Sequence, residues 1–245
     1  MRFWEWIEAS ADTEERAVLV IDNVIDSGTS WYEDAVTPAA FREQLEAHRG
    51  QNIMVEINSP GGDVFAGFEI YNMLQAHQGA VRVRVVGMAA SAASIIAMAA
   101  STGELIMSHA SMMMIHNPWA CVQGDAEGLR EQADVLDMIR DVLVDIYMRR
   151  FAGSEDELRA MLDEETWLTP ARAAQLGLCD EVEFPEEGSN PQSAMIGRYA
   201  ALSRESMAKI CERLGVVRHA PREALAVDAK QLLAEADERI RAAIG

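Results

Sequence analysis

The sequence predicts an α/β protein built around a parallel sheet. Three short strand-like runs, the first rich in β-branched residues and the third alternating basic and apolar residues, are each followed by a segment with the start, the apolar spacing or the length of a helix. Strands that alternate with helices in this way imply parallel pairing with right-handed crossovers. The chain has 245 residues, of which 49% are hydrophobic and 25% charged, and this composition suits one main globular core.

These three strand-helix units occupy the first part of the chain. Thr37 and Pro38 fit the N-cap and the first position of the first helix. The turn NSPGGD at 58–63 joins the second strand to its helix. In the third unit, an Ala/Ser-rich segment with the length of a helix follows Gly87. The predicted strands are 17–22, 52–57 and 81–86, and the other predicted helices are 37–48 and 64–77.

Further elements follow before residue 185. A long amphipathic helix is predicted from about 125 to 150. A later helix begins with the Thr-Pro pair at 169 and closes with Gly177, which fits a C-cap position. The predicted apolar face of the long helix consists of Leu129, Ala133, Leu136, Ile139, Leu143 and Ile146. The additional extended segments are 104–108, 111–116 and 178–184.

The composition changes after Pro185. The segment EEGSNPQS is typical of a linker, and the remainder is rich in Ala, Arg and Glu without a strand pattern. We therefore predict a main domain over 1–185, followed by a linker and a helical C-terminal extension over 186–245. This extension is a small appendage, a partner-binding segment or a helix without a catalytic role.

The charge and the cysteines argue against several functional classes. A formal net charge of −19 disfavours a nucleic-acid binder, which needs a basic face. The N-terminal MRFWEWIEAS lacks the basic start and apolar centre of a signal peptide, and no apolar run reaches the roughly 18 residues of a membrane helix. A cytoplasmic protein is expected. Cys121, Cys179 and Cys211 lack zinc-site spacing, so neither a metal nor a cofactor is expected.

Ser91 is the candidate nucleophile. It lies four residues after Gly87, at a predicted strand-to-helix turn, where its hydroxyl would face the first amides of the helix. Ser94 and Ser101 lie deeper in the predicted helix and are better explained by packing. A simple N-cap remains the alternative for Ser91.

A histidine must activate Ser91 if it is a nucleophile. The only lysines, Lys209 and Lys230, lie in the predicted extension, which excludes a Ser-Lys pair in the main domain. His116 closes an apolar strand at its carboxyl end, where open α/β sheets hold their sites, and His109 is the other candidate. A structural histidine is the alternative.

The glycine-rich turn at 58–63 is a candidate binding turn, beside the candidate nucleophile and the candidate base. Two glycines after a proline let backbone N–H groups approach a ligand, as an oxyanion hole or a phosphate cradle requires. The Lys-Ser/Thr pair of a P-loop is missing, which favours acyl chemistry. A plain tight turn is the alternative.

Four motifs in order carry a resemblance to a known family. INSPGGDVFAGFEIYNML, GMAAS, MMMIHNP and ETWLTPARAAQLGLCDEV lie between residues 17 and 184. With them the sequence resembles the ClpP-type serine peptidases, most closely the ClpP-like head-maturation (prohead) proteases of phages. The resemblance implies a crotonase-like spiral of β-β-α units with a projecting handle. It also implies homo-oligomeric rings, often stacked in pairs, around a proteolytic chamber.

The resemblance also implies roles for individual residues. Ser91 matches the nucleophile and His116 the general base, while Gly62 and Ala92 match the oxyanion-hole amides. Glu165 lies where the family mostly has an aspartate. Three other carboxylates are alternatives for the acid, as is a solvated acidic run without a catalytic role. These carboxylates are Asp163, Glu164 and Asp180.

The resulting prediction is a serine endopeptidase of phage head maturation. It would act on capsid, scaffold or portal polypeptides in the host cytoplasm or prohead, and a Clp-type ATPase unfoldase is a candidate partner. Segment 117–128 and the helix after it match the handle. A crotonase-fold acyl-CoA enzyme and a non-catalytic ring component are the competing hypotheses.

Overall fold

A computed structural model describes residues 16–28 and 34–184. The predicted linker and extension at 186–245 lie outside these residues, as do Lys209, Cys211 and Lys230. The domain boundary near 186 therefore stays a prediction.

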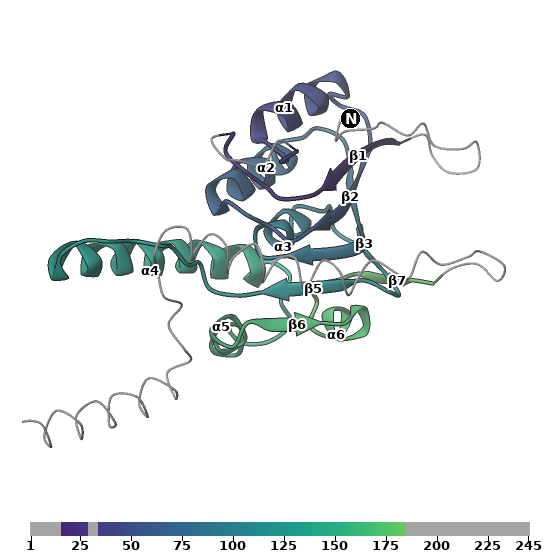
Figure 1. Ribbon diagram of the computed structural model, residues 1–245. Coiled ribbons are helices and arrows are strands. Elements are labelled where there is room, and N and C mark those ends of the chain that lie inside the picture. Colours follow the sequence, from purple (N-terminus) through teal and green to yellow (C-terminus); the bar gives the residue numbers. More distant parts are fainter. Residues whose placement is uncertain (1–15, 29–33, 185–245) are drawn as a thin grey trace, which may run out of the picture. The chain divides into compact units, whose positions relative to one another are not determined.

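A seven-stranded sheet, counted over the described residues, forms the centre of the structure (Figure 1). Its main path runs in the order β1-β2-β3-β4-β7, and every neighbouring pair on this path is parallel. Strand β5 pairs in parallel with the second half of β3, and β6 pairs antiparallel with β5. The α/β prediction with a parallel sheet is confirmed, and the antiparallel β6 was not predicted. The strands are β1 (Ala17–Asp22), β2 (Ile53–Ser59), β3 (Val81–Ala90), β4 (Leu105–Ser108), β5 (Met112–Ile115), β6 (Thr166–Leu168) and β7 (Glu181–Glu183).

The helices begin at side chains that can cap them. Thr37 and Thr169 each accept a hydrogen bond from a backbone N–H of the helix that follows, with proline at the next position. Ser154 and Glu157 form a capping box at a helix that the sequence pattern had not indicated. The helices are α1 (Pro38–Ala47), α2 (Val64–Gln75), α3 (Ala92–Ala97), α4 (Ala126–Met148), α5 (Glu155–Asp163) and α6 (Pro170–Gln175).

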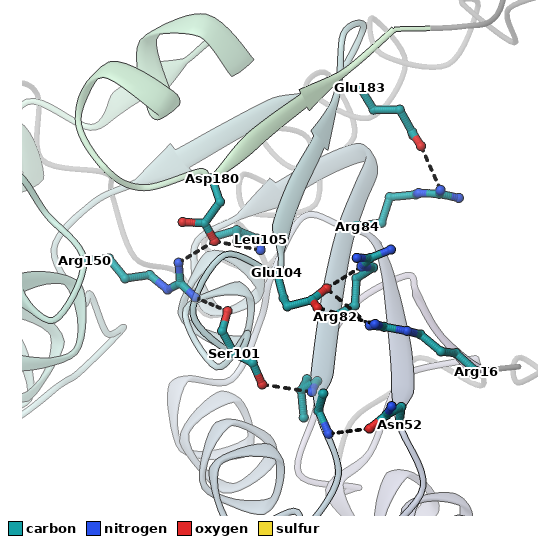
Figure 2. A network of polar contacts seen from close by, with 12 residues as sticks. Arg16, Asn52, Arg82, Arg84, Ser101, Glu104, Leu105, Arg150, Asp180 and Glu183 are labelled. Carbon is teal, nitrogen blue, oxygen red and sulfur yellow. Dashed lines mark hydrogen bonds and ion pairs between the residues drawn. The ribbon is translucent and has the colours of Figure 1, made fainter. Parts of the chain in front are cut away.

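The two faces of the sheet differ in chemistry. Alternate residues of β2 and β3 are buried and form the core with residues of α1, α2 and α3. Between them lie half-buried side chains, several of which are charged. Figure 2 shows Arg16 and Arg82 both paired with Glu104. It also shows Arg84 paired with Glu183. Arg16 is buried, but Arg82 and Arg84 are partly exposed, so their two pairs each contribute only about 0–1 kcal/mol. The apolar face supplies most of the stability.

The Ala/Ser-rich segment is not one helix. Strand β3 continues through Gly87 to Ala90, because residues 88–90 pair with β5, and the helix begins only at Ala92. Ser101 was expected inside this helix, but it lies beyond the helix end, where its hydroxyl oxygen accepts a hydrogen bond from the Val81 N–H. The small side chains suit a strand and a short helix that have close neighbours on several sides.

Helix α4 is buried only near its C-terminal end. Of the predicted apolar face, Leu143 and Ile146 are buried, whereas Leu129 and Ala133 are exposed. Figure 1 shows the first part of α4 extending away from the sheet, as the expected handle would. Its exposed large apolar residues are Leu129, Val135, Met138 and Val142. No helix among the described residues is both long and apolar enough to cross a bilayer.

Candidate active site

Ser91 occupies a strained turn between β3 and α3. Its φ of 54° and ψ of −125° lie outside the regions that most residues other than glycine adopt. The turn is held in place because the Ser91 N–H donates to the Met114 carbonyl of β5. Gly61 packs directly against it, since a Cβ at Gly61 would lie 2.8 Å from the Ser91 Cβ. A sharp strand-to-helix turn of this kind exposes a hydroxyl at the end of a sheet.

Strand pairing brings His116 to Ser91. Ala90 lies opposite Met114 in the β3–β5 pair, so the residues that follow the two strands emerge side by side. The His116 Nε2 lies 2.7 Å from the Ser91 Oγ, which is hydrogen-bond distance. The prediction that His116 follows the carboxyl end of an apolar strand is confirmed.

The surroundings of His116 favour its neutral form. Its side chain is only 12% exposed, and this burial lowers the pKa of the imidazole below its ordinary value, while the charge of Glu165 opposes that shift. A neutral imidazole keeps a free lone pair at neutral pH. When Nε2 accepts the Ser91 hydroxyl, the ring proton is on Nδ1, which faces Glu165.

Glu165 reaches His116 through a second strand pair. Ile115 of β5 lies opposite Thr166 of β6, so the antiparallel register places residue 165 beside residue 116. The Glu165 Oε2 lies 4.0 Å from the His116 Nδ1, within ion-pair range but longer than a hydrogen bond. Glu165 has a φ of 52° and a side chain that is 42% exposed, so its carboxylate stays well hydrated.

None of the three alternative carboxylates is paired with His116. Asp163 accepts a hydrogen bond from the Asn117 side chain, and Glu164 is the C-cap of α5. Asp180 pairs with Arg150 and accepts from the Leu105 N–H, as Figure 2 shows. Among the described residues, Glu165 is the one carboxylate within ion-pair distance of His116.

Two backbone amides near Ser91 can face a developing negative charge. Ala92 is the first residue of α3, a position whose N–H has no partner within the helix. Gly62 forms a bridge with Ile25, in which Ile25 bonds to the Gly61 carbonyl and the Asp63 N–H. The N–H of Gly62 is therefore directed away from Ile25. A Cβ at Gly61 would lie 2.8 Å from the Ala92 nitrogen, so the glycine turn and the start of α3 are neighbours.

Comparison with known proteins identifies the family. Residues 14–186 match the protein family described as Clp protease. The chain belongs to the Clp protease family. This membership implies a serine peptidase, and the family predicted from the four motifs is confirmed.

Relatives within the Clp protease family include bacterial proteolytic subunits. The chain is 31% identical over 186 residues to the ATP-dependent Clp protease proteolytic subunit 1 of Protochlamydia amoebophila, covering 70% of this chain and 85% of the relative. It is 33% identical over 168 residues to the ATP-dependent Clp protease proteolytic subunit of Bacteroides fragilis, covering 67% of this chain and 80% of the relative.

Two features of this Clp-family site were not predicted from the sequence. Gly61 makes the close approach to Ser91, although only its neighbour Gly62 was assigned a role; the paired glycines were the available signal. Ser94 was explained by packing, but its hydroxyl donates to the Ser91 carbonyl and contacts the Tyr147 hydroxyl. Nothing in the sequence pattern indicated this link, because Tyr147 falls on the apolar side of a long helix. Among the described residues, no cluster of side chains could hold a metal ion.

Proposed function

We propose that this chain is a serine endopeptidase in which Ser91, His116 and Glu165 form the catalytic triad. The observation that carries the proposal is the 2.7 Å contact between the His116 Nε2 and a serine hydroxyl on a strained turn. Burial that lowers the pKa of His116 supports it, because a general base must be neutral to accept a proton.

The proposed reaction follows from these positions. The Ser91 Oγ attacks the peptide carbonyl carbon while His116 Nε2 takes the hydroxyl proton. The carbonyl oxygen becomes an oxyanion, which accepts hydrogen bonds from the Gly62 and Ala92 amides. His116 then gives its proton to the leaving amine, the C–N bond breaks, and an acyl-enzyme remains. Water, activated by His116, hydrolyses this ester and restores Ser91.

Labelling with a fluorophosphonate tests the nucleophile. The full-length protein should form an adduct that peptide mass spectrometry places on Ser91, and His116→Ala should prevent it. An adduct at another serine would contradict the assignment. An assembled protein that forms no adduct would favour a crotonase-fold acyl-CoA enzyme or a non-catalytic ring component, neither of which needs an activated Ser91.

Replacing Glu165 with glutamine should lower kcat moderately and shift the pH profile. Because the carboxylate is 4.0 Å from Nδ1 and partly exposed, we expect a loss of about 10- to 100-fold, below the roughly 10⁴-fold known for a buried, hydrogen-bonded acid. Neutral His116 is the active form, so kcat/KM should fall as the pH drops below the pKa of His116. Glu165 raises that pKa, and its removal should move the acid limb to lower pH.

A pH-rate profile of wild type and Glu165→Gln measures both effects. Glu164→Gln is the matched control, since Glu164 is next in sequence but is the C-cap residue of α5, whose backbone N–H donates into the helix. An acid limb that stays in place in Glu165→Gln, or moves equally in Glu164→Gln, would contradict the role of Glu165.

We further propose that the subunit assembles into a homo-oligomeric ring or stacked double ring. The exposed apolar residues of α4, together with Trp119 and Val122, support this proposal because burying them would remove apolar surface from water. The relatives are named as proteolytic subunits of ATP-dependent proteases, which supports a Clp-type ATPase as partner. Analytical ultracentrifugation that finds only a monomer would contradict the ring.

The phage role is a finer part of the same proposal. Its support is the sequence resemblance to head-maturation proteases, while the relatives described above are bacterial Clp subunits. The proposed substrates are capsid, scaffold or portal polypeptides in the host cytoplasm or prohead. Coexpression with a phage capsid, scaffold or portal protein should give cleavage that Ser91→Ala abolishes.

A further inference from the structure

Tyr147 and Ser94 form a buried polar pair behind the proposed active site. Tyr147 lies in the last full turn of α4 and is 1% exposed, and Ser94 in α3 is fully buried. Their hydroxyl oxygens are 2.7 Å apart, and the Ser94 Oγ is 2.6 Å from the Ser91 carbonyl oxygen. The proposed reaction uses neither side chain. Both hydroxyls lie in an otherwise apolar core, where a polar group needs a partner.

The direction of these hydrogen bonds follows from counting protons. A carbonyl oxygen only accepts, so the Ser94 hydroxyl donates its single proton to the Ser91 carbonyl. The Tyr147 hydroxyl must then donate to the Ser94 Oγ. Burial raises the pKa of Tyr147, which keeps this donor protonated at working pH. The chain of donors therefore runs from Tyr147 through Ser94 to the backbone of Ser91.

This carbonyl belongs to the same peptide group as the Ala92 N–H. A trans peptide is planar, and its C=O and N–H point in opposite directions. Fixing the Ser91 carbonyl toward Ser94 therefore aims the Ala92 N–H to the opposite side. Electrostatic stabilisation depends on donors that are oriented before the charge develops. A rotation of this one peptide would turn the Ala92 donor away from the oxyanion.

We propose that Tyr147 and Ser94 are positioning residues, which orient the Ser91–Ala92 peptide so that the Ala92 N–H points into the oxyanion hole. This inference rests on the proposed serine-peptidase function and adds two residues that do not touch the substrate. Tyr147 lies near the C-terminal end of α4, so this end of the helix helps to set the geometry of the oxyanion hole. The N–H groups of Ser94 and Ile95 also donate to the Ser91 carbonyl, at 2.9 and 3.4 Å, and these bonds leave a partial restraint when the hydroxyls are removed.

Tyr147→Phe tests this role because it keeps the ring and removes only the hydroxyl. On a fluorogenic peptide, kcat should fall about tenfold with KM within twofold of wild type, a smaller loss than the roughly 10²–10³-fold for deleting an oxyanion donor. A peptide aldehyde of the same sequence forms a hemiacetal whose oxygen occupies the oxyanion hole. Its affinity should fall by the same factor as kcat. The acid limb of the pH profile should not move, because His116 is untouched.

Tyr71→Phe is the matched control. Tyr71 is also buried, and its hydroxyl has no hydrogen-bond partner among the described residues. Its removal should leave kcat and aldehyde affinity unchanged. Ser94→Ala is the second test variant, and its kcat and aldehyde affinity should fall as in Tyr147→Phe. The double variant Tyr147→Phe/Ser94→Ala should be no slower than Ser94→Ala alone. The double variant tests the chain of donors, because Tyr147 acts only through Ser94.

The outcomes separate this inference from the proposed function. An active wild type with an equally active Tyr147→Phe and Ser94→Ala would overturn the positioning role and leave the peptidase intact. A loss confined to KM, or a shifted acid limb, would also overturn it. A wild type that neither cleaves peptides nor reacts with the fluorophosphonate would overturn both. Matching losses of kcat and aldehyde affinity, with Tyr71→Phe unchanged, would establish it.

Discussion

Replacing Ser91 with alanine should reduce peptide hydrolysis by roughly 10⁴-fold or more, and His116→Ala should do the same. In the proposed mechanism neither residue acts without the other, because the proton passes across the 2.7 Å contact between the His116 Nε2 and the Ser91 Oγ. The loss should appear in kcat with little change in KM. Rates on a fluorogenic peptide, measured with the full-length protein, give both constants.

The double variant and a histidine control sharpen this prediction. Ser91→Ala combined with His116→Ala should be no slower than either single variant, since the two residues act as a unit. His109→Ala is the control, because the His109 ring stacks on Phe184 with centroids 5.8 Å apart. It should retain full activity. Additive losses in the double variant, or inactivity of His109→Ala, would refute the assigned pair.

Replacing Gly62 with alanine should cost both activity and stability. The new Cβ would lie 2.0 Å from the Ile25 carbonyl oxygen, so the backbone must move, and with it the Gly62 N–H. We expect kcat/KM to fall about 10²–10³-fold, as for loss of an oxyanion donor. The free energy of unfolding should fall by about 2–4 kcal/mol, because a backbone clash is added to a φ of 151°. Urea unfolding and peptide kinetics measure the two effects.

Gly103→Ala separates the clash from backbone strain. Gly103 also has a positive φ, 79°, but nothing lies within 4 Å of its added Cβ. Strain alone should cost about 1 kcal/mol of stability and leave kcat/KM unchanged. If Gly62→Ala behaves like Gly103→Ala in both measurements, the glycine turn does not hold an oxyanion donor.

Local patterns in the sequence were sufficient for most of the fold. The Thr-Pro pairs at 37 and 169 marked two helix starts, and the short runs at 17–22, 52–57 and 81–86 marked β1, β2 and the first part of β3. Where the patterns were wrong, tertiary contacts were the reason. Residues 88–90 have small or flexible side chains that would suit a helix, but pairing with β5 makes them a strand. The first part of α4 has an apolar face, yet no described element buries it.

The candidate site also depends partly on local sequence patterns and partly on tertiary contacts. Ser91 and His116 were singled out from their places at the ends of predicted strands, and the parallel β3–β5 pair then puts them in contact. The resemblance placed Glu165 at the position of the acid and left three other carboxylates as alternatives, and the antiparallel β5–β6 pair then puts residue 165 beside residue 116. No local pattern in the sequence contains that register, and the catalytic role of Glu165 remains a proposal.

The sequence by itself determined the candidate catalytic residues and most of the elements that hold them, because capping, periodicity and motif order are properties of neighbouring residues. The tertiary structure decided how distant residues meet. It extended β3 to Ala90, placed Gly61 against Ser91, and joined Tyr147 to the Ser91 carbonyl through Ser94. These contacts depend on strand register and on close packing between elements far apart in the chain, which no short stretch of sequence specifies.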